Sequence, residues 1–384
     1  MDKKRVLILD GYARQTLPMT KGFKDVDCTV TVVCFSKWDV GYASRLPDHK
    51  ILWDCPKDDY DSQERLAIKL IEKGDYDIVV PMTDYSAIYL AANKERLSEF
   101  AYIAVNDKSV FDLAINKLNT MRVCAENDIP APKTLFTTDP LSDIAASGLQ
   151  FPVVIKPKTA CGSIGFSIID SREHLARVLS DYTGENGELF VQEYVRAGGL
   201  QYNVHMVMDS ESERAIGVAS IKRRWFPLDG GAATCIQTIE HEPLLQECER
   251  LLKSIGWIGY ADLDLIEDTT DGKIKVIEIN PRISANVKLC FHAGVNVSKA
   301  IYELATGRPV ASCQVANQKI MRCFLTDLLW FLKSKDRFKT VPGWFSLKNS
   351  TEAIFSWHDI KPFFTFCVQS AKNYKHAMQQ RKRQ

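Results

Sequence analysis

The chain has 384 residues, of which 46% are hydrophobic and 25% are charged. These values are typical of a globular protein with a sizeable core and two to three folding units. No apolar run approaches the roughly 18 to 20 residues of a membrane-spanning helix, and the first residues hold too few apolar side chains for a signal peptide. The eleven cysteines include no CxxC pair, which indicates reduced thiols and not a disulfide framework or a zinc site. We therefore expect a cytoplasmic protein.

The formal net charge of +1 conceals an uneven distribution. From Lys319 to the end, 13 lysines and arginines face 4 aspartates and glutamates, and this part is also rich in aromatic residues. One interpretation is a small packed appendage with a solvated basic end. The other is a C-terminal tail that makes peripheral contact with an anionic membrane or an anionic substrate. Both interpretations stay open, and we expect no nucleic-acid partner.

The first hundred residues predict strands that alternate with helices. Short β-rich runs such as 5–10 and 77–81 flank a segment with helical spacing at 62–74. This alternation predicts a parallel sheet with ligands at the carboxyl ends of its strands. The dinucleotide fingerprint GxGxxG is absent, which argues against a nicotinamide enzyme. Asp84, just after the second run, is suited either to binding a substrate amino group or to capping the next helix.

Two β-rich segments after residue 258 carry a stripe of polar side chains. Asp262 and Asp264 alternate in the first, and Glu278, Asn280 and Arg282 alternate in the second. Residues two apart in a strand face the same side, and an Asp-Gly pair between the segments predicts a hairpin. Antiparallel pairing would gather the carboxylates and the amide on one face, where like charges are costly without a cation. The pattern indicates either a site for a hard divalent ion such as Mg²⁺ or a solvated sheet face.

Another polar feature joins a strand to a loop of small residues. The strand places Lys156 and Lys158 on one face, although Lys158 is equally well explained as a solvated neighbour. Glycines let a backbone approach a ligand closely, and a hydroxyl and a lysine suit phosphate oxygens. The loop residues that fit this role are Gly162, Ser163 and Gly165. No GKS or GKT follows, so this is not a Walker A loop.

The order of these features along the chain resembles the ATP-grasp superfamily over roughly residues 105–310. The succession runs from a helix with Lys117 through the Lys156 strand and its glycine loop to FVQEYV, KRRWFPLDGGAAT, GYADLDL and EINPR. The runs RRWFPLDGGAAT and SWHDIKPFF look closest to the carbamoyl-phosphate-synthase-large-chain-like carboxylate–amine ligases, a group that includes D-aspartate ligases.

The resemblance implies an α/β (α+β) architecture. It would be an ATP-grasp fold with an N-terminal Rossmann-like (pre-ATP-grasp) domain and a small basic, aromatic C-terminal extension. The expected units are a pre-ATP-grasp domain at 1–110, an ATP-grasp subdomain with the lysines and glycine loop at 111–190, a second subdomain with the adenine strand and metal-binding hairpin at 191–315, and the extension at 316–384.

The resemblance also implies which residues bind ATP. Lys117 and Lys156 would contact the phosphates from two sides of a cleft, and the loop with Gly162, Ser163 and Gly165 would close over them. Glu193 would accept from the adenine amino group, and the backbone of Tyr194 and Val195 would read the ring edge. Gln201 stands where the family usually has an acidic ribose ligand.

The remaining roles concern the metal and the substrates. Asp264, Glu278 and Asn280 match the family's ligands for Mg²⁺, which Mn²⁺ could replace, and Asp262 could assist them. Arg282 would hold the acyl phosphate. For Arg223 and Arg224 there are two interpretations, recognition of the substrate carboxylate by one of them or a solvent-facing basic loop.

The implied activity is an ATP-dependent carboxylate–amine ligase, which converts ATP, an acid and an amine to ADP, phosphate and an amide. Its substrates would be small molecules, such as an amino acid, a peptide or a cell-envelope precursor. One alternative is carboxyphosphate or carbamoyl-phosphate chemistry with bicarbonate as the acid, and another is a non-catalytic nucleotide-binding module. The chain is compatible with a monomer or a homo-oligomer.

Overall fold

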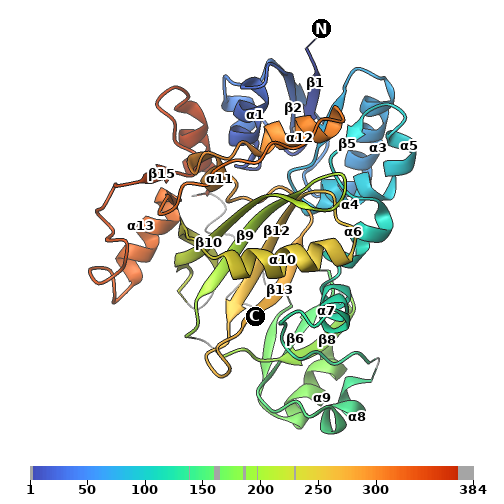
Figure 1. Ribbon diagram of the computed structural model, residues 1–384, viewed down its shortest axis with the longest axis vertical. Coiled ribbons are helices and arrows are strands. Elements are labelled where there is room, and N and C mark those ends of the chain that lie inside the picture. Colours follow the sequence, from blue (N-terminus) through green and yellow to red (C-terminus); the bar gives the residue numbers. More distant parts are fainter. Residues whose placement is uncertain are drawn as a thin grey trace.

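Three β-sheets organise the chain in the computed structural model, which describes residues 3–137, 139–159, 165–184, 187–196, 198–228 and 231–370. Figure 1 shows an N-terminal sheet at the top, a large central sheet below it and a small sheet at the bottom. The central sheet thus lies between the other two. The fold is mixed α/β, as the sequence predicts.

The N-terminal sheet has five parallel strands in the order β3-β2-β1-β4-β5. The predicted parallel sheet is therefore present, and its central strands are fully buried aliphatic runs, as parallel strands covered on both faces require. The strands are β1 (Arg5–Ile8), β2 (Thr29–Cys34), β3 (His49–Leu52), β4 (Ile78–Val80) and β5 (Tyr102–Ile103). The helices are α1 (Thr16–Lys24), α2 (Val40–Ala43), α3 (Tyr60–Glu72), α4 (Asp84–Ala92), α5 (Lys94–Leu97) and α6 (Lys108–Ile115).

The small sheet is antiparallel, with β6 between β7 and β8. One of its faces packs against two helices through an apolar cluster that contains Val153, Leu175 and Val191. Its opposite face is the one that carries Lys156, because Lys156 and Val153 are an odd number of residues apart in one strand. The elements are α7 (Lys117–Glu126), α8 (Pro140–Ser147), β6 (Val153–Pro157), β7 (Ser167–Ile169), α9 (Arg172–Asp181) and β8 (Leu189–Glu193).

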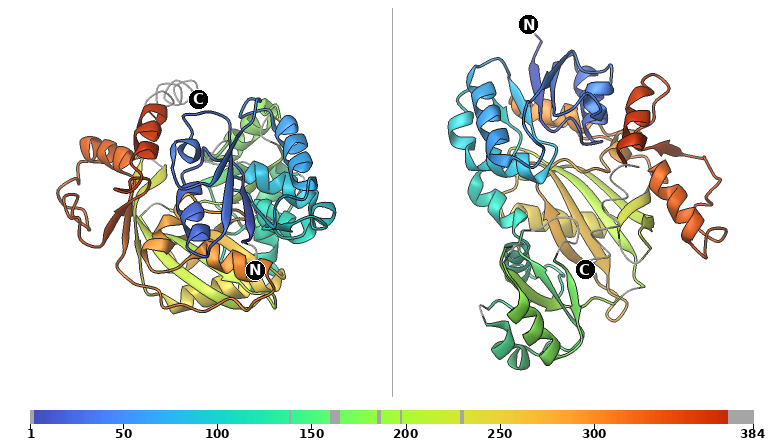
Figure 2. Two further views of the ribbon diagram at one scale, coloured as in Figure 1. Left: turned by 90° about the horizontal axis from the view of Figure 1, so that it is seen from above. Right: turned by 180° about the vertical axis from the view of Figure 1, so that it is seen from behind.

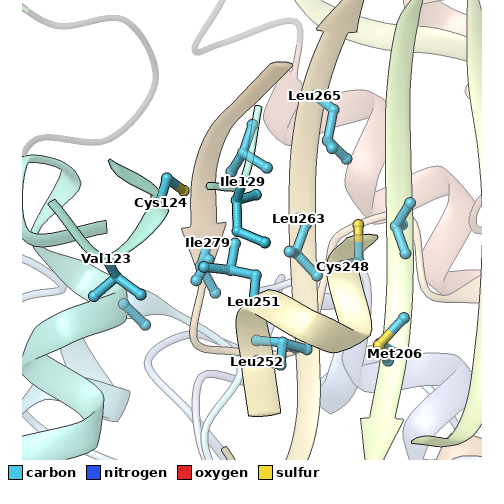
Figure 3. Packing of buried hydrophobic residues seen from close by; sticks show 14 of the residues in the cluster. Val123, Cys124, Ile129, Met206, Cys248, Leu251, Leu252, Leu263, Leu265 and Ile279 are labelled. Atoms are coloured by element: carbon cyan, nitrogen blue, oxygen red, sulfur yellow. The ribbon is translucent and has the colours of Figure 1, made fainter. Parts of the chain in front are cut away.

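The central sheet has seven strands in the order β13-β12-β9-β10-β11-β14-β15. Its first part comprises β9 (Gln201–Met208), β10 (Arg214–Phe226), β11 (Ala232–Thr238), α10 (Glu242–Ser254), β12 (Gly259–Glu267), β13 (Ile274–Asn280), α11 (Lys288–His292) and α12 (Val297–Ala305). Helix α10 repeats apolar residues every three to four positions and buries that side on one face of the sheet. Figure 3 shows Cys248, Leu251 and Leu252 of α10 packed with Met206 and Leu263 of the strands.

The N-terminal unit covers the other face of the central sheet at one end. Helices α1 and α12 pack together, and a shared apolar cluster includes Phe23, Val207 and Ile301. Polar contacts add to this: Gln15 Nε2 donates to the carbonyls of Met82 (2.5 Å) and Ile283 (3.4 Å). The carboxyl end of β4 is thereby fixed beside the segment that follows β13.

Residues 316–370 extend the central sheet by two strands. Strand β14 (Ile320–Arg322) pairs antiparallel with β11, and β15 (Ser350–Glu352) pairs parallel with β14. Helix α13 (Phe324–Lys333) packs against β10 and β11, and residues 361–370 are helical. In Figure 2 this part stands out to one side of the molecule. Among the described residues, no helix is both long and apolar enough to cross a membrane.

Candidate functional site

The predicted polar stripe lies on one face of β9, β12 and β13. Strands β12 and β13 pair antiparallel, with Asp264 opposite Glu278 and Asp262 opposite Asn280, as the hairpin pattern predicts. Strand β9 adds Asn203 opposite Asp264. Paired residues project from the same face of a sheet, so four oxygen-bearing side chains and one more amide gather here. The opposite face is the apolar one that α10 covers.

Two lysines compensate the two central carboxylates. Lys222 Nζ lies 2.7 Å from Asp264 Oδ1, and Lys117 Nζ lies 2.8 Å from Glu278 Oε2. Burial favours the neutral form of Asp264, but the adjacent Lys222 outweighs burial and holds the pKa of Asp264 below its usual value. Burial likewise opposes the charge of Lys222, and Asp264 raises the pKa of Lys222 above its usual value. Both groups are therefore charged at neutral pH.

Lys222 was missed by the sequence interpretation, which singled out the two arginines that follow it. The signal that points to Lys222 is its position in β10, two residues after Ser220. Ser220 pairs with Asn203, and Asn203 in turn pairs with Asp264. Residues two apart in a strand share a face, so Lys222 belongs to the polar stripe.

Lys156 and Lys117 come together beside Glu278, as the ATP-grasp resemblance implies. Lys156 is buried, and burial lowers its pKa to about 8, with Glu278 opposing the shift and Lys117 adding to it. Its ammonium also lies 5.3 Å from the centre of the Phe190 ring. The backbone N–H of Lys117 donates to the carbonyl of Lys158 at 2.8 Å, which fixes the start of α7 against the end of β6. Two segments of the chain thus present both lysines to one carboxylate.

Arg282 is held by three polar side chains at the end of the stripe. Its Nε lies 3.4 Å from Asp84 Oδ1, its Nη1 lies 3.3 Å from Asp262 Oδ2, and its Nη2 donates to Asn280 Oδ1 at 3.0 Å. Asp84 is the first residue of α4, but Thr83 provides the helix cap. Asp84 is therefore not the cap of α4. Its ion pair connects the N-terminal unit to Arg282. Asp262 faces Arg282 and also accepts from Asn203 at 2.5 Å, so it orients its neighbours.

The donor set fits a hard divalent cation. Asp264 and Glu278 offer carboxylate oxygens, and Asn280 offers an amide oxygen. Asn280 Nδ2 donates to Asp264 at 3.4 Å and its Oδ1 accepts from Arg282 at 3.0 Å, so the amide would have to turn for its oxygen to join Asp264 at a cation. Asn203 Oδ1 is buried and has no hydrogen-bond partner among the described residues. Within those residues no group of three or more His, Cys, Asp and Glu side chains is arranged to hold a metal alone. Two carboxylates and an amide match a Mg²⁺ site that phosphate and water would complete.

Part of the glycine loop can be located. Gly162 and Ser163 lie outside the described residues. Gly165 has a φ of +72°, a conformation that suits glycine. Lys158 forms an ion pair with Glu188.

The Glu193 side chain does not share the face of Lys156. Glu193 pairs with Val153, so both project toward α8 and α9, while Lys156 pairs with Phe190 on the other face. The Glu193 carboxylate lies 3.1 Å from Lys275 Nζ and accepts from the backbone N–H of Lys133 at 3.0 Å. Gln192 is the residue of this strand that shares the face of Lys156, because alternate residues change sides.

The two arginines of β10 do not reach the stripe, so their predicted contact with the substrate carboxylate is corrected. A register shift places Ile236 opposite Lys222 but Cys235 opposite Arg224, which turns Arg224 to the other face. Arg224 is fully buried there, with Nε and Nη2 at 2.7 and 3.0 Å from the carboxylate oxygens of Asp327. Arg223 donates to Gln237 at 2.8 Å, and this glutamine pairs with Ile221 of the apolar face.

The other positions expected to contact the nucleotide lie near the small sheet and the start of β9. Tyr194 and Val195 follow β8 directly. Gln201 is the first residue of β9 and shares the face of Asn203, since the two are two residues apart.

Taken together, the fold and the stripe define an α/β protein with a lysine-rich, acidic site between two sheets. Comparison with known proteins shows which family this architecture is similar to. Residues 114–286 match the family model for the ATP-grasp domain, in agreement with the resemblance predicted from the motifs.

Relatives and solved structures agree with this assignment. The chain is 24% identical over 246 residues to a D-aspartate ligase of Enterococcus faecium, which covers 59% of this chain and 58% of that protein. It is 26% identical over 178 residues to a D-alanine–D-alanine ligase of Ectopseudomonas mendocina, with 44% and 55% covered. The fold is similar to that of a biotin carboxylase–β-γ-ATP complex from Campylobacter jejuni, with a TM-score of 0.70, 14% identity and coverage of 83% and 74%. The chain spans just over half the length of these two curated relatives.

Proposed function

We propose that the protein is an ATP-dependent ligase that joins a carboxylate to an amine through an acyl phosphate. One observation carries the proposal: Lys117, Lys156 and Lys222 come from three elements of an ATP-grasp domain and converge on Asp264 and Glu278. Cations that surround a pair of carboxylates suit a triphosphate together with its metal ion. Phosphoryl transfer depends mainly on such positioning and charge compensation.

The phosphates of ATP are assigned to Lys117 and Lys156 and to the glycine loop with Gly162, Ser163 and Gly165. The buried Lys156 supplies a positive charge in a place where water screens it little, which strengthens its attraction for phosphate. Lys117 is the first residue of α7, whose amino-terminal end also favours an anion.

The adenosine part is assigned to the space beside β8 and the start of β9. The backbone of Tyr194 and Val195 would read the adenine edge, and Gln201 would bind the ribose. Gln192 lies on the face of this site, although its amide already donates to Thr134 Oγ1 at 2.7 Å and so fixes the strand.

Asp264, Glu278 and Asn280 would hold Mg²⁺, or Mn²⁺ in its place. When bound, the ion offsets the negative charge of the phosphates and of the reacting carboxylate. Asp264 and Glu278 must then exchange their lysine partners for the ion. Lys117 and Lys222 would thereby be released toward the phosphates, which links metal and nucleotide binding.

The reaction proceeds in two steps. A carboxylate oxygen of the acid attacks the γ-phosphorus, and the bond to the ADP oxygen breaks. The amine nitrogen then attacks the acyl carbon, the bond between that carbon and the phosphate oxygen breaks, and the nitrogen releases a proton. Arg282, fixed by Asp84 and Asp262, is positioned to bind the charge that develops on the acyl phosphate. No protein nucleophile is required.

The names of the two relatives suggest the substrate class, because both describe the ligation of D-amino acids. We therefore assign the acid and the amine to amino acids, peptides or cell-envelope precursors. The test is ADP release with Mg²⁺ across a panel of D- and L-amino acids and dipeptides. The proposal requires ADP to form only with a matching acid and amine, and one ¹⁸O from a labelled carboxylate to appear in the phosphate.

Two other outcomes would replace the proposal. Turnover with bicarbonate and no amino acid would indicate carboxyphosphate chemistry. Tight binding of Mg²⁺ and ATP with no ADP release from any member of the panel would indicate a nucleotide-binding module.

A further inference from the structure

The last two residues of α13 and the loop that follows them expose large apolar side chains. We name residues 332–348 the projecting loop, since they extend from α13 at the side of the molecule in Figure 1. Five apolar side chains in it are mostly exposed: Leu332 (58%), Phe338 (77%), Val341 (71%), Phe345 (72%) and Leu347 (79%). Single exposed apolar residues are common, but several close in sequence mark an interaction surface.

The base of the projecting loop is fixed by the buried ion pairs on the apolar face of the sheet. Arg224 Nη1 donates to the carbonyl of Pro342 at 2.8 Å. The Trp344 indole donates to the backbone carbonyl of Asp327 at 3.1 Å, and the Arg322 guanidinium lies 5.2 Å from the centre of the Trp344 ring. These contacts hold the middle of the loop. The exposed side chains are therefore presented from an anchored base and do not fold back into the core.

Basic residues alternate with these apolar side chains along the projecting loop. The projecting loop contains Lys333, Lys335, Arg337, Lys339 and Lys348 but one acidic residue, Asp336. Its four lysines are exposed, and none of them forms an ion pair with another described residue. The loop thus combines aromatic and aliphatic tips with an excess of four positive charges.

We propose that the projecting loop docks on the surface of an anionic lipid bilayer. Aromatic and aliphatic side chains insert at the boundary between headgroups and acyl chains, and nearby lysines attract anionic lipids. A second copy of the chain would bring the same positive loop against this one, and charge repulsion opposes that pairing. A nucleic acid would use the rings and the lysines but not the exposed Leu332, Val341 and Leu347.

The test is flotation of the full chain with vesicles of phosphatidylcholine alone or with 30% phosphatidylglycerol. We expect binding to the anionic vesicles that weakens in high salt. The double variants Phe338→Ser/Phe345→Ser and Lys335→Glu/Lys339→Glu should each weaken it at least about tenfold. The matched controls are Phe100→Ser and Lys69→Glu/Lys73→Glu, which alter exposed side chains of the N-terminal unit and should bind like the parent chain.

Three results would overturn the proposal. The first is no binding of the parent chain to anionic vesicles. The second is unchanged binding of both loop variants, because the basic residues after 370 would then account for it. The third is loss of a dimer in light scattering when the loop is altered, because the loop would then be a self-interface. ADP release with substrates added in solution should be the same in parent and loop variants, which separates this test from that of the ligase activity.

Discussion

Lys222 and Asp264 form a partly buried ion pair across the width of strand β9. Lys222 stands in β10 and Asp264 in β12, yet their charged atoms are 2.7 Å apart. With the Lys117–Glu278 pair, it gives each central carboxylate a lysine partner. The acidic stripe is thus stable as a set of ion pairs, and the lysines that stabilise it are those that the proposed function directs to the phosphates.

Replacement of Glu278 by glutamine should abolish metal-dependent turnover. The change keeps the shape of the side chain but removes one carboxylate charge from the metal site and from Lys117. We expect ADP release to fall at least about 100-fold, in the range found when one group that stabilises the transition state is removed. Steady-state kinetics and Mg²⁺ titration by calorimetry measure the effect. Glu242→Gln, which alters an exposed carboxylate paired with Arg214, is the matched control. Full activity of Glu278→Gln would remove the metal assignment.

Replacement of Lys222 by methionine should destabilise the protein most when no metal ion is present. The change leaves the partly buried charge of Asp264 without its lysine partner, and an unpaired carboxylate with restricted access to water is destabilising. We expect the melting temperature to fall in EDTA and to recover partly when Mg²⁺ is added, because the ion then supplies the missing positive charge.

The conservative variant Lys222→Arg serves as the control for Lys222→Met, since it retains a positive charge. Its melting temperature should stay closer to that of the parent chain in EDTA. An equal loss of stability for Lys222→Met with and without Mg²⁺ would show that Asp264 does not exchange Lys222 for the ion.

The sequence predicted the parts of the site that depend on local pattern. Alternation in β12 and β13 and the Asp-Gly turn between them determine which side chains share a face, so the grouping of Asp264, Glu278 and Asn280 followed from residues less than 20 positions apart. The order of motifs added Lys117 and Lys156. The same order of motifs implied the ATP-grasp fold.

Contacts between distant segments could not be predicted in this way. One of Arg223 and Arg224 was expected at the substrate because arginines often bind carboxylates, but the partner of Arg224, Asp327, lies 103 residues further along the chain. The bulge that separates the directions of Lys222 and Arg224 has no clear signal in the sequence. The direction of the Glu193 side chain likewise depends on the pairing of β8 with β6.

Replacement of Asp327 by asparagine should affect stability and not substrate binding. Asp327 accepts from both Arg224 and Arg322, and its side chain is almost fully buried. Loss of its charge leaves two guanidinium groups without a counterion, so we expect the free energy of unfolding to fall by about 3 to 5 kcal/mol. Chemical denaturation gives this value. Measured below the melting temperature, the KM for the acid should equal that of the parent. A KM increase of tenfold or more would return Arg224 to the substrate site.

The binding of ATP should weaken as pH rises above about 8, because burial lowers the pKa of Lys156 to about 8. The free protein loses the charge of Lys156 above this pH, whereas bound phosphate would keep the lysine protonated. The dissociation constant of ATP with Mg²⁺ should therefore rise by up to about tenfold per pH unit above 8. In the absence of ATP, the contribution of Lys156 to the stability of the fold changes with pH in the opposite direction. The unfolded chain holds its proton up to a pKa near 10.5, so the contribution of Lys156 to stability increases between pH 8 and that value.

Calorimetric titrations from pH 6.5 to 9.5 measure this dependence, and Lys156→Arg is the control, because a guanidinium stays charged over the whole range. If Lys156 contacts the phosphates, the parent should show a decline in affinity that begins near pH 8, and the variant should show a weaker decline or none. The same decline in both proteins would assign the pH dependence to another group and would remove Lys156 from the phosphate site. Loss of affinity at every pH in Lys156→Met, together with an unchanged melting temperature, would in turn show that the lysine acts on the nucleotide and not on the fold.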